Sequence, residues 1–114
     1  KLGQFYTPIN IVQKMICEIE NSLQCLTNTD FIIDPACGTG VFVIEIIKEL
    51  KKIFHQSAVI EYVKKNIFAY DVNPFAVIAT KINIAYILIK ELPQEIVRIL
   101  DFIMNADNVF NNIQ

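Results

Sequence analysis

The spacing of apolar residues divides the chain into segments of helical and strand-like character. Apolar side chains recur every three or four positions between residues 8 and 25, which predicts an amphipathic helix that starts at Thr7-Pro8. The same spacing predicts helices over residues 41–53 and from Asn73-Pro74 onward. The last of these has the most regular pattern of the chain, formed by Phe75, Ile78, Ile82, Ala85 and Ile89.

Short apolar runs between these helices predict strands. Phe31-Ile32-Ile33 and Ile67-Phe68-Ala69-Tyr70 are apolar throughout and end at Asp34 and Asp71, as expected of strands buried on both faces. Residues 59–65 allow one or two helical turns, and Pro93 starts a shorter amphipathic segment. The run Phe102-Ile103-Met104, before Asp107, predicts a third strand.

Strands separated by helices require crossover connections and therefore a parallel sheet. We predict an α/β doubly wound unit whose parallel strands are covered by helices on both faces and preceded by an N-terminal helix. The sequence shows no internal repeat or low-complexity linker, so residues 1–114 form a single module. The chain starts at Lys1 and ends in a polar stretch, which we expect of a piece of a longer protein.

Composition excludes several classes of protein. Apolar residues make up 54% of the chain and charged residues 19%, which argues against disorder. No apolar run is long enough to span a membrane, and three cysteines without a C-x-x-C pair or secretory signal argue against a disulfide scaffold or a metal site. We therefore expect a cytoplasmic protein. The net charge of −2 and the isoelectric point near 5.3 argue against a basic stripe that would bind nucleic acid.

Residues suited to ligand binding or catalysis follow the ends of the predicted strands, where open α/β sheets bind ligands. They form Asp34-Pro35-Ala36-Cys37-Gly38-Thr39-Gly40, Asp71-Val72-Asn73-Pro74 and Asn105-Ala106-Asp107-Asn108. A dinucleotide-binding loop would have a third glycine, and a P-loop would have Gly-Lys-Ser/Thr; neither occurs here. An acid at the end of the first strand suits a cationic or zwitterionic ligand better than a pyrophosphate.

These segments resemble a known family. Asp34 to Gly40 is similar to the first motif of S-adenosylmethionine-dependent methyltransferases, in the form used by adenine-N6-specific DNA methyltransferases. Gly3-Gln4-Phe5-Tyr6-Thr7-Pro8 resembles a segment of type I restriction modification subunits and of fused restriction-modification enzymes. Tyr70 to Pro74 and Asn105 to Asp107 resemble the second and third motifs. The resemblance implies the N-terminal, cofactor-binding half of such an enzyme, with a partial Rossmann-like fold.

The resemblance also implies roles for residues near the first two motifs. Thr7 would approach the methionine carboxylate of S-adenosylmethionine, unless it is only a helix cap. Asp34 would lie near the ammonium group, or else it only caps the glycine turn. Asp71 would accept both ribose hydroxyls, or else it caps the helix that starts at Pro74. The other cofactor-binding residues implied are Pro35, Ala36, Gly38, Gly40 and Val72.

The third motif completes the implied cofactor site. Asp107 would accept the exocyclic amine of the cofactor's adenine, with Asn108 or Val109 beside the ring, unless Asp107 is only a turn residue. Cys37 receives no covalent role, because no His or second Cys stands near it in sequence to activate it. The lone His55 and the lysines between residues 48 and 65, which alternate with glutamates, are expected at the solvated surface.

One part of the family pattern is missing. The catalytic motif, Asn or Asp followed by Pro-Pro and an aromatic residue, is absent because the sequence contains no Pro-Pro pair. We therefore expect the piece to be inactive alone, with DNA bound through downstream regions and with specificity or restriction subunits as further partners. The alternatives are a methyltransferase acting on RNA or protein and a non-catalytic cofactor-binding subunit.

Overall fold

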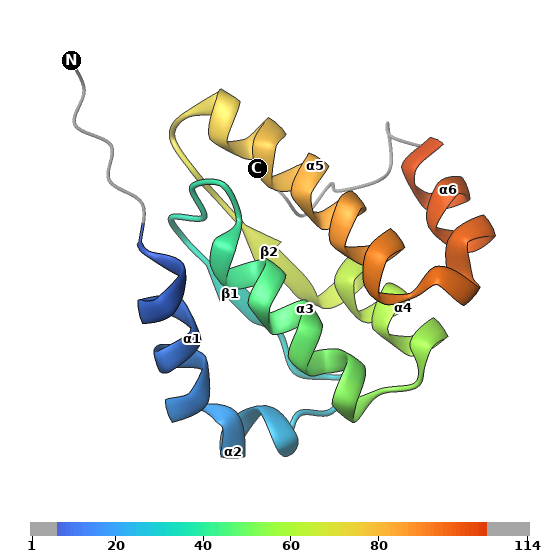
Figure 1. Cartoon of the computed structure of the whole chain (residues 1–114), viewed down its shortest axis with the longest axis horizontal. Coiled ribbons are helices and arrows are strands. Elements are labelled where there is room, and N and C mark those ends of the chain that lie inside the picture. Colours follow the sequence, from blue (N-terminus) through green and yellow to red (C-terminus); the bar gives the residue numbers. More distant parts are fainter. Residues whose placement is uncertain (1–6, 105–114) are drawn as a thin grey trace.

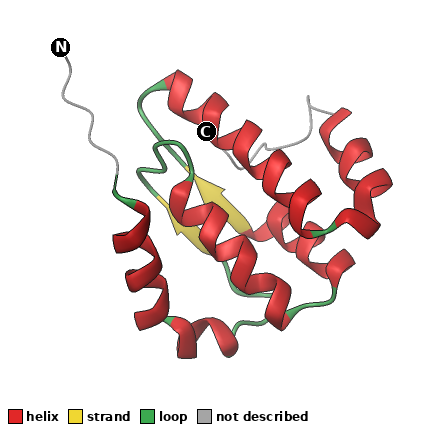
Figure 2. Cartoon of the chain, viewed as in Figure 1, coloured by secondary structure: helices red, strands yellow, loops and turns green. Residues whose placement is uncertain are grey.

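The computed structural model describes residues 7–104, with side chains described as far as Asp101. The elements follow in the order α1 (Ile9–Glu18), α2 (Glu20–Gln24), β1 (Ile32–Asp34), α3 (Val41–Ile53), α4 (Gln56–Asn66), β2 (Ile67–Ala69), α5 (Pro74–Glu91), a 3-10 turn (Pro93–Glu95) and α6 (Ile96–Met104). Helices dominate this part of the chain, and its two strands lie behind α3 (Figures 1 and 2).

The two strands form a parallel pair, as predicted. Ile32 pairs with Ile67, and Asp34 pairs with Ala69. The connection between them runs through α3 and α4, because parallel neighbours need a crossover of a dozen or more residues. Both strands therefore run in the same direction, and their carboxyl ends lie at the same end of the sheet.

Helices α1, α3 and α5 form one layer over the sheet, with α3 between the other two (Figure 1). The interior of this layer consists of fully buried aliphatic residues, among them Val12 from α1, Val43, Ile47 and Leu50 from α3, and Ile84 and Leu88 from α5. Burying each such side chain contributes roughly 1.5–3 kcal/mol. The layer holds fixed the starts of α3 and α5, which both follow a strand.

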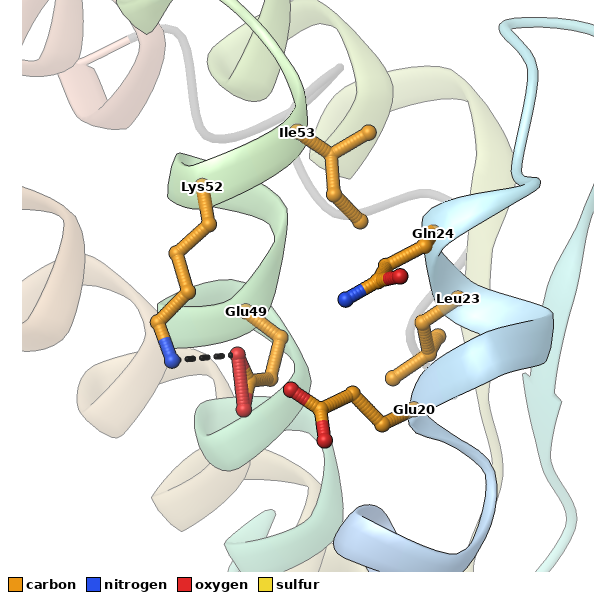
Figure 3. Close-up of a pocket in the computed structure, with 6 residues that line it drawn as sticks. All are labelled: Glu20, Leu23, Gln24, Glu49, Lys52 and Ile53. Carbon is orange, nitrogen blue, oxygen red and sulfur yellow. Dashed lines mark ion pairs between the residues drawn. The ribbon is translucent and has the colours of Figure 1, made fainter.

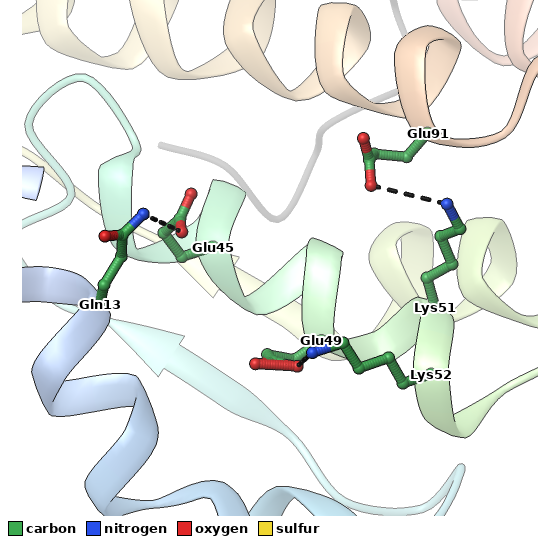
Figure 4. A network of polar contacts seen from close by, with 6 residues as sticks. All are labelled: Gln13, Glu45, Glu49, Lys51, Lys52 and Glu91. Atoms are coloured by element: carbon green, nitrogen blue, oxygen red, sulfur yellow. Dashed lines mark hydrogen bonds and ion pairs between the residues drawn. The ribbon is translucent and has the colours of Figure 1, made fainter.

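Polar contacts along α3 connect it to its two neighbours (Figure 4). Gln13 of α1 donates from Nε2 to Oε1 of Glu45 at 3.3 Å, and Lys51 pairs with Glu91 of α5 at 3.7 Å. Glu45 is buried, and its other oxygen pairs with Lys48 at 2.8 Å, so its charge is compensated. These contacts add to the apolar packing of α3 between α1 and α5.

Three predictions about the elements are wrong. The single helix over residues 8–25 is two helices, because the backbone leaves the helical conformation at Ile19, which has φ −102° and ψ 8°. Residues 102–104 form the last turn of α6 and not a strand, because a three-residue apolar run has no periodicity that distinguishes the two. The sheet is covered on one face only within the described residues, since Phe31 and Ile33 are 62% and 63% exposed.

The apolar stripe predicted for α5 is exposed over its first half, whereas Ile89 at its end packs against the core. Phe75, Ile78 and Ile82 are 78%, 53% and 63% exposed, although their spacing is that of a core-facing stripe. The buried side is formed by Ala76, Thr80, Ile84, Ile87 and Leu88. Helix α5 is apolar around most of its circumference, so periodicity alone does not determine which side packs on α3.

Candidate functional site

The loops that follow β1 and β2 meet at the carboxyl end of the sheet. The N–H of Tyr70 donates to the carbonyl of Asp34 at 2.9 Å, and the N–H of Cys37 donates to the carbonyl of Tyr70 at 2.8 Å. The strand ladder thus continues past Asp34 and Ala69 into the two loops. The structure therefore brings together the first two segments that the sequence singled out.

Asp71 joins these loops through one carboxylate oxygen and holds its own loop with the other. Oδ2 accepts the N–H of Gly38 at 2.9 Å, and Oδ1 accepts the N–H of Asn73 at 2.8 Å. The N-cap of α5 is Asn73, whose side chain accepts the N–H of Phe75 at 2.9 Å, so Asp71 is not the cap. A carboxylate offers about four lone-pair sites, and these contacts use two of them. Asp71 can therefore accept further hydrogen bonds.

Asp34 has an oxygen that lacks a donor. Oδ1 accepts the N–H of Ala36 at 3.2 Å, and this bond caps the glycine turn. Oδ2 is buried and accepts no hydrogen bond from any residue between 7 and 104. Burial raises the pKa of the Asp34 carboxyl, the N–H of Ala36 lowers it, and the nearby Asp71 carboxylate raises it further. The net effect is a raised pKa. A cationic donor at this position would relieve both causes of the increase.

The glycine loop packs against α5, a contact that sequence reasoning missed. Thr80 donates from Oγ1 to the carbonyl of Gly38 at 2.9 Å, and Asn83 donates from Nδ2 to the carbonyl of Thr39 at 2.9 Å. Gly40 has φ +87°, and a Cβ there would lie 2.9 Å from Cγ2 of Thr80, so only glycine fits without strain. The available signal was the placement of two polar residues, Thr80 and Asn83, within a mostly apolar helix.

The other predicted site residues that the structure describes lie in exposed parts of the loops or before α1. Pro35 and Ala36 are exposed in the turn, and Val72 is fully exposed beside Asp71. Thr7 precedes α1, whose N-cap is Pro8 with no side-chain cap bond, so the capping alternative for Thr7 is wrong. Helix α1 begins at the end of the molecule where α3 also begins (Figure 1). Residues 1–6, Asp107 and Asn108 lie outside the described residues.

Cys37 lies in the loop as a buried thiol. Burial raises its pKa, and the carboxylates of Asp34 and Asp71 raise it further. The net effect is a pKa above the ordinary value, so the thiol stays protonated at neutral pH. Thr80 Oγ1 lies 3.4 Å from the sulfur but has only one proton, which the nearer and stronger carbonyl acceptor of Gly38 takes. A buried, protonated thiol is a poor nucleophile.

A surface pocket lies elsewhere, between α2 and α3 (Figure 3). It has a volume of about 330 Å³ and is lined by Glu20, Leu23, Gln24, Glu49, Lys52 and Ile53. Lys52 and Glu49 pair with each other at 2.8 Å, as Figure 3 shows. None of these residues belongs to the loops after β1 and β2, so we do not assign the pocket to this site.

The surface lysines and His55 behave as predicted. Lys64 and Lys65 both pair with Glu61, at 3.7 and 3.3 Å, and His55 is exposed. From Thr7 to Met104 no cluster of His, Cys, Asp and Glu could hold a metal ion. No helix in this same range is long and apolar enough to cross a membrane.

The family follows from a comparison with known proteins. Searches of curated proteins and of solved structures find no match. A family model described as "N-6 DNA Methylase" matches residues 1–106, which is most of the 114-residue chain. The match includes the two loops joined by Asp71 and extends beyond the described residues to the start of the third motif. The chain therefore belongs to the N-6 DNA methylase family.

Proposed function

We propose that this chain is the S-adenosylmethionine-binding part of an adenine-N6-specific DNA methyltransferase of a restriction-modification system. The family match supports methyl transfer to DNA. The observation that supports cofactor binding is the contact between the Asp71 carboxylate and the N–H of Gly38, at 2.9 Å. It connects an acid after one parallel strand to a glycine loop after the neighbouring strand.

The fold that we propose is a partial Rossmann-like unit. Two parallel strands, a crossover that includes α3, and a helical layer over one face of the sheet agree with this interpretation. In such folds, ligands bind outside the carboxyl ends of the strands, which is where Asp34 and Asp71 lie. The position of the candidate site thus follows the general rule for open parallel sheets.

The residues present fit the chemistry of S-adenosylmethionine. Its ammonium group would give the unpartnered oxygen of Asp34 a charged donor and would offset the repulsion from Asp71. Its ribose hydroxyls would use the lone pairs of Asp71 that Gly38 and Asn73 leave free. The glycine loop lets the backbone approach a ligand at Gly38, which carries no Cβ, whereas the Cβ position of Gly40 faces Thr80. We further propose that Thr7 and Asp107 complete the cofactor site.

The cofactor would supply an activated methyl group, and the residues of this chain would bind and orient it. The acceptor side needs other residues, because the sequence has no Asn/Asp-Pro-Pro-aromatic motif to hold a flipped adenine. We propose that regions outside this sequence bind DNA, that specificity or restriction subunits associate with the protein, and that it acts in the cytoplasm. The 114-residue chain alone would then be inactive.

Calorimetric titration of the complete protein with S-adenosylmethionine tests this proposal. Asp71→Ala is expected to weaken binding by about 1.5–3 kcal/mol, because hydrogen bonds to a charged acceptor are lost. Asp30→Ala is the matched control, since Asp30 also accepts a backbone N–H, from Thr27 at 2.8 Å, but lies in a turn away from the site. Equal affinity of wild type and Asp71→Ala would contradict the assignment of Asp71.

A second measurement tests the reaction. The complete protein is incubated with labelled S-adenosylmethionine and genomic DNA, and the nucleosides are separated by mass spectrometry. Label on N6 of deoxyadenosine is the expected result. Label on RNA or protein substrates and not on DNA would favour the first alternative, and no transfer despite cofactor binding would favour a non-catalytic subunit.

A further inference from the structure

We propose that Thr80 and Asn83 of α5 are positioning residues, which set the peptide orientations of the glycine loop and thereby its affinity for the cofactor. This inference rests on the proposed function, since it concerns the same loop. It adds residues outside the three sequence motifs.

The two side chains bind consecutive carbonyls of the loop. Thr80 Oγ1 lies 2.9 Å from the carbonyl of Gly38, and Asn83 Nδ2 lies 2.9 Å from the carbonyl of Thr39. Thr80 and Asn83 are three positions apart, so they share one face of α5. That spacing allows a single rigid helix to hold two neighbouring peptide units.

Fixing a carbonyl also fixes the N–H on the other side of the same peptide bond. All described peptide bonds are trans, so an N–H points away from the carbonyl of the preceding residue. Because the carbonyl of Gly38 faces Thr80, the N–H of Thr39 faces away from α5. That N–H donates to no other residue in the described part of the chain. The loop therefore presents a free donor on the side opposite to the helix.

Packing supports the same assignment. Thr80 has no exposed surface, and the ideal Cβ position of Gly40 is 2.9 Å from its Cγ2 and 3.3 Å from its Cα. The loop thus touches α5 at Gly40 while hydrogen bonds hold the two preceding carbonyls. A buried carbonyl that lost its donor would reorient or remain unsatisfied, at a cost of about 1–3 kcal/mol.

Helix α5 also connects this contact to Asp71. The helix starts at Pro74 and is capped by Asn73. The N–H of Asn73 donates to the carboxylate of Asp71 at 2.8 Å. The carboxylate of Asp71 in turn accepts the N–H of Gly38. The same helix therefore holds the glycine loop from one side and carries the Asp71 segment at its start, so it contacts both halves of the proposed cofactor site.

The test compares variants of similar shape in the complete protein. Thr80→Val removes the hydroxyl and keeps the volume, whereas Thr80→Ser keeps the hydroxyl. Asn83→Asp replaces the donor with an acceptor that repels the carbonyl of Thr39. Tyr86→Phe is the matched control, because Tyr86 lies on α5 but is 63% exposed. The measurements are S-adenosylmethionine affinity by calorimetry, kcat and KM for both substrates, and hydrogen exchange of the loop amides.

The expected result separates a positioning role from a general loss of stability. Thr80→Val and Asn83→Asp should each weaken S-adenosylmethionine binding about tenfold, which corresponds to one lost hydrogen bond, while Thr80→Ser and Tyr86→Phe stay within about twofold of wild type. The KM for S-adenosylmethionine should rise, with the KM for DNA unchanged. Exchange of the Gly38 and Gly40 amides should accelerate in Thr80→Val and return to the wild-type rate in Thr80→Ser.

Three results would overturn the inference: unchanged affinity in Thr80→Val and Asn83→Asp, equal losses in Thr80→Val and Thr80→Ser, or unchanged loop exchange. If Thr80→Val does not fold, Asn83→Asp provides the same comparison, because Asn83 is only partly buried. A wild-type protein that binds no S-adenosylmethionine would instead overturn the proposed function, and loop exchange would still test the contact with α5.

Discussion

Replacing Asp34 with asparagine should change stability and cofactor binding in opposite directions. In the unliganded protein, Oδ2 of Asp34 is buried without a donor, and the Asp71 carboxylate is nearby. Asparagine keeps an oxygen for the N–H of Ala36 and removes the charge. An unpaired neutral amide still costs free energy, but less than an unpaired carboxylate. The substitution should therefore stabilise the protein without ligand.

The size of this gain follows from the surroundings of the carboxyl group. Asp34 is half-buried, so solvent screens part of the penalty, and we expect a gain of about 1 kcal/mol at neutral pH. For a domain of this size, that gain raises Tm by about 4 °C. In the presence of S-adenosylmethionine the effect reverses, because the ammonium group loses its charged acceptor and affinity should fall about tenfold or more.

The pH dependence has a definite sign. The pKa of Asp34 is raised in the folded protein above its ordinary value of 3.8, so the folded state holds the proton more tightly than the unfolded state. The charged carboxyl therefore lowers stability as the pH rises from 3.8 through the raised pKa, and the full penalty is present above that pKa. The gain from Asp34→Asn should be present at pH 7 and should disappear as the pH falls toward 3.8.

Thermal unfolding of wild type and Asp34→Asn at several pH values, with and without S-adenosylmethionine, measures these effects. Asp30→Asn is the control for removing a carboxylate that accepts a backbone N–H elsewhere, and it should leave cofactor affinity unchanged. A lower Tm of Asp34→Asn at pH 7 without ligand would refute the reasoning, since it would mean that the Asp34 carboxylate has a stabilising partner.

Three further predictions concern Gly40, Asp71 and the isolated chain. Gly40→Ala should lower stability by about 1–3 kcal/mol, measured by chemical unfolding, because φ is +87° and the new Cβ would lie 2.9 Å from Cγ2 of Thr80; an unchanged midpoint would show that the loop can shift. Asp71→Ala should weaken S-adenosylmethionine binding by about 1.5–3 kcal/mol in a calorimetric titration, whereas a full-affinity variant would leave Asp71 only a structural role. The 114-residue chain should transfer no label from S-adenosylmethionine to mixed-sequence DNA, because it lacks a Pro-Pro motif; transfer above a protein-free control would mean that the catalytic residues lie within it.

The sequence predicts the parts of the fold in which local pattern and turn chemistry agree. The bounds of α3 and the pairing of a strand at residues 32–34 with one at 67–69 follow from apolar runs that end at aspartates and glycines. The proximity of Asp71 to the glycine loop follows from the rule that parallel strands end at the same edge. These features depend on spacing and direction, which the sequence contains.

Other features depend on tertiary packing and were not predictable in this way. The end of α1 at Ile19 interrupts an apolar pattern that continues to Leu23, so periodicity gives no sign of the break. The packed side of α5 is determined by α3 and the glycine loop. Thr80 is buried against them, whereas the more apolar Ile78 and Ile82 are exposed. The contacts of Thr80 and Asn83 with the loop join residues more than 40 positions apart, beyond the reach of local patterns.

The close approach of Gly40 to Thr80 restricts how the two positions can change in evolution. A side chain at position 40 meets both Cγ2 and Cα of Thr80, so a smaller residue at position 80 would remove the first contact but not the second. Serine would keep the hydroxyl that holds Gly38, but Oγ1 at position 80 is itself 3.2 Å from the new Cβ, and alanine would remove that hydroxyl. A compensatory substitution at position 80 could therefore restore only part of the stability that a mutation at Gly40 removes. Genetic selections for suppressors should seldom recover a pair of substitutions at positions 40 and 80.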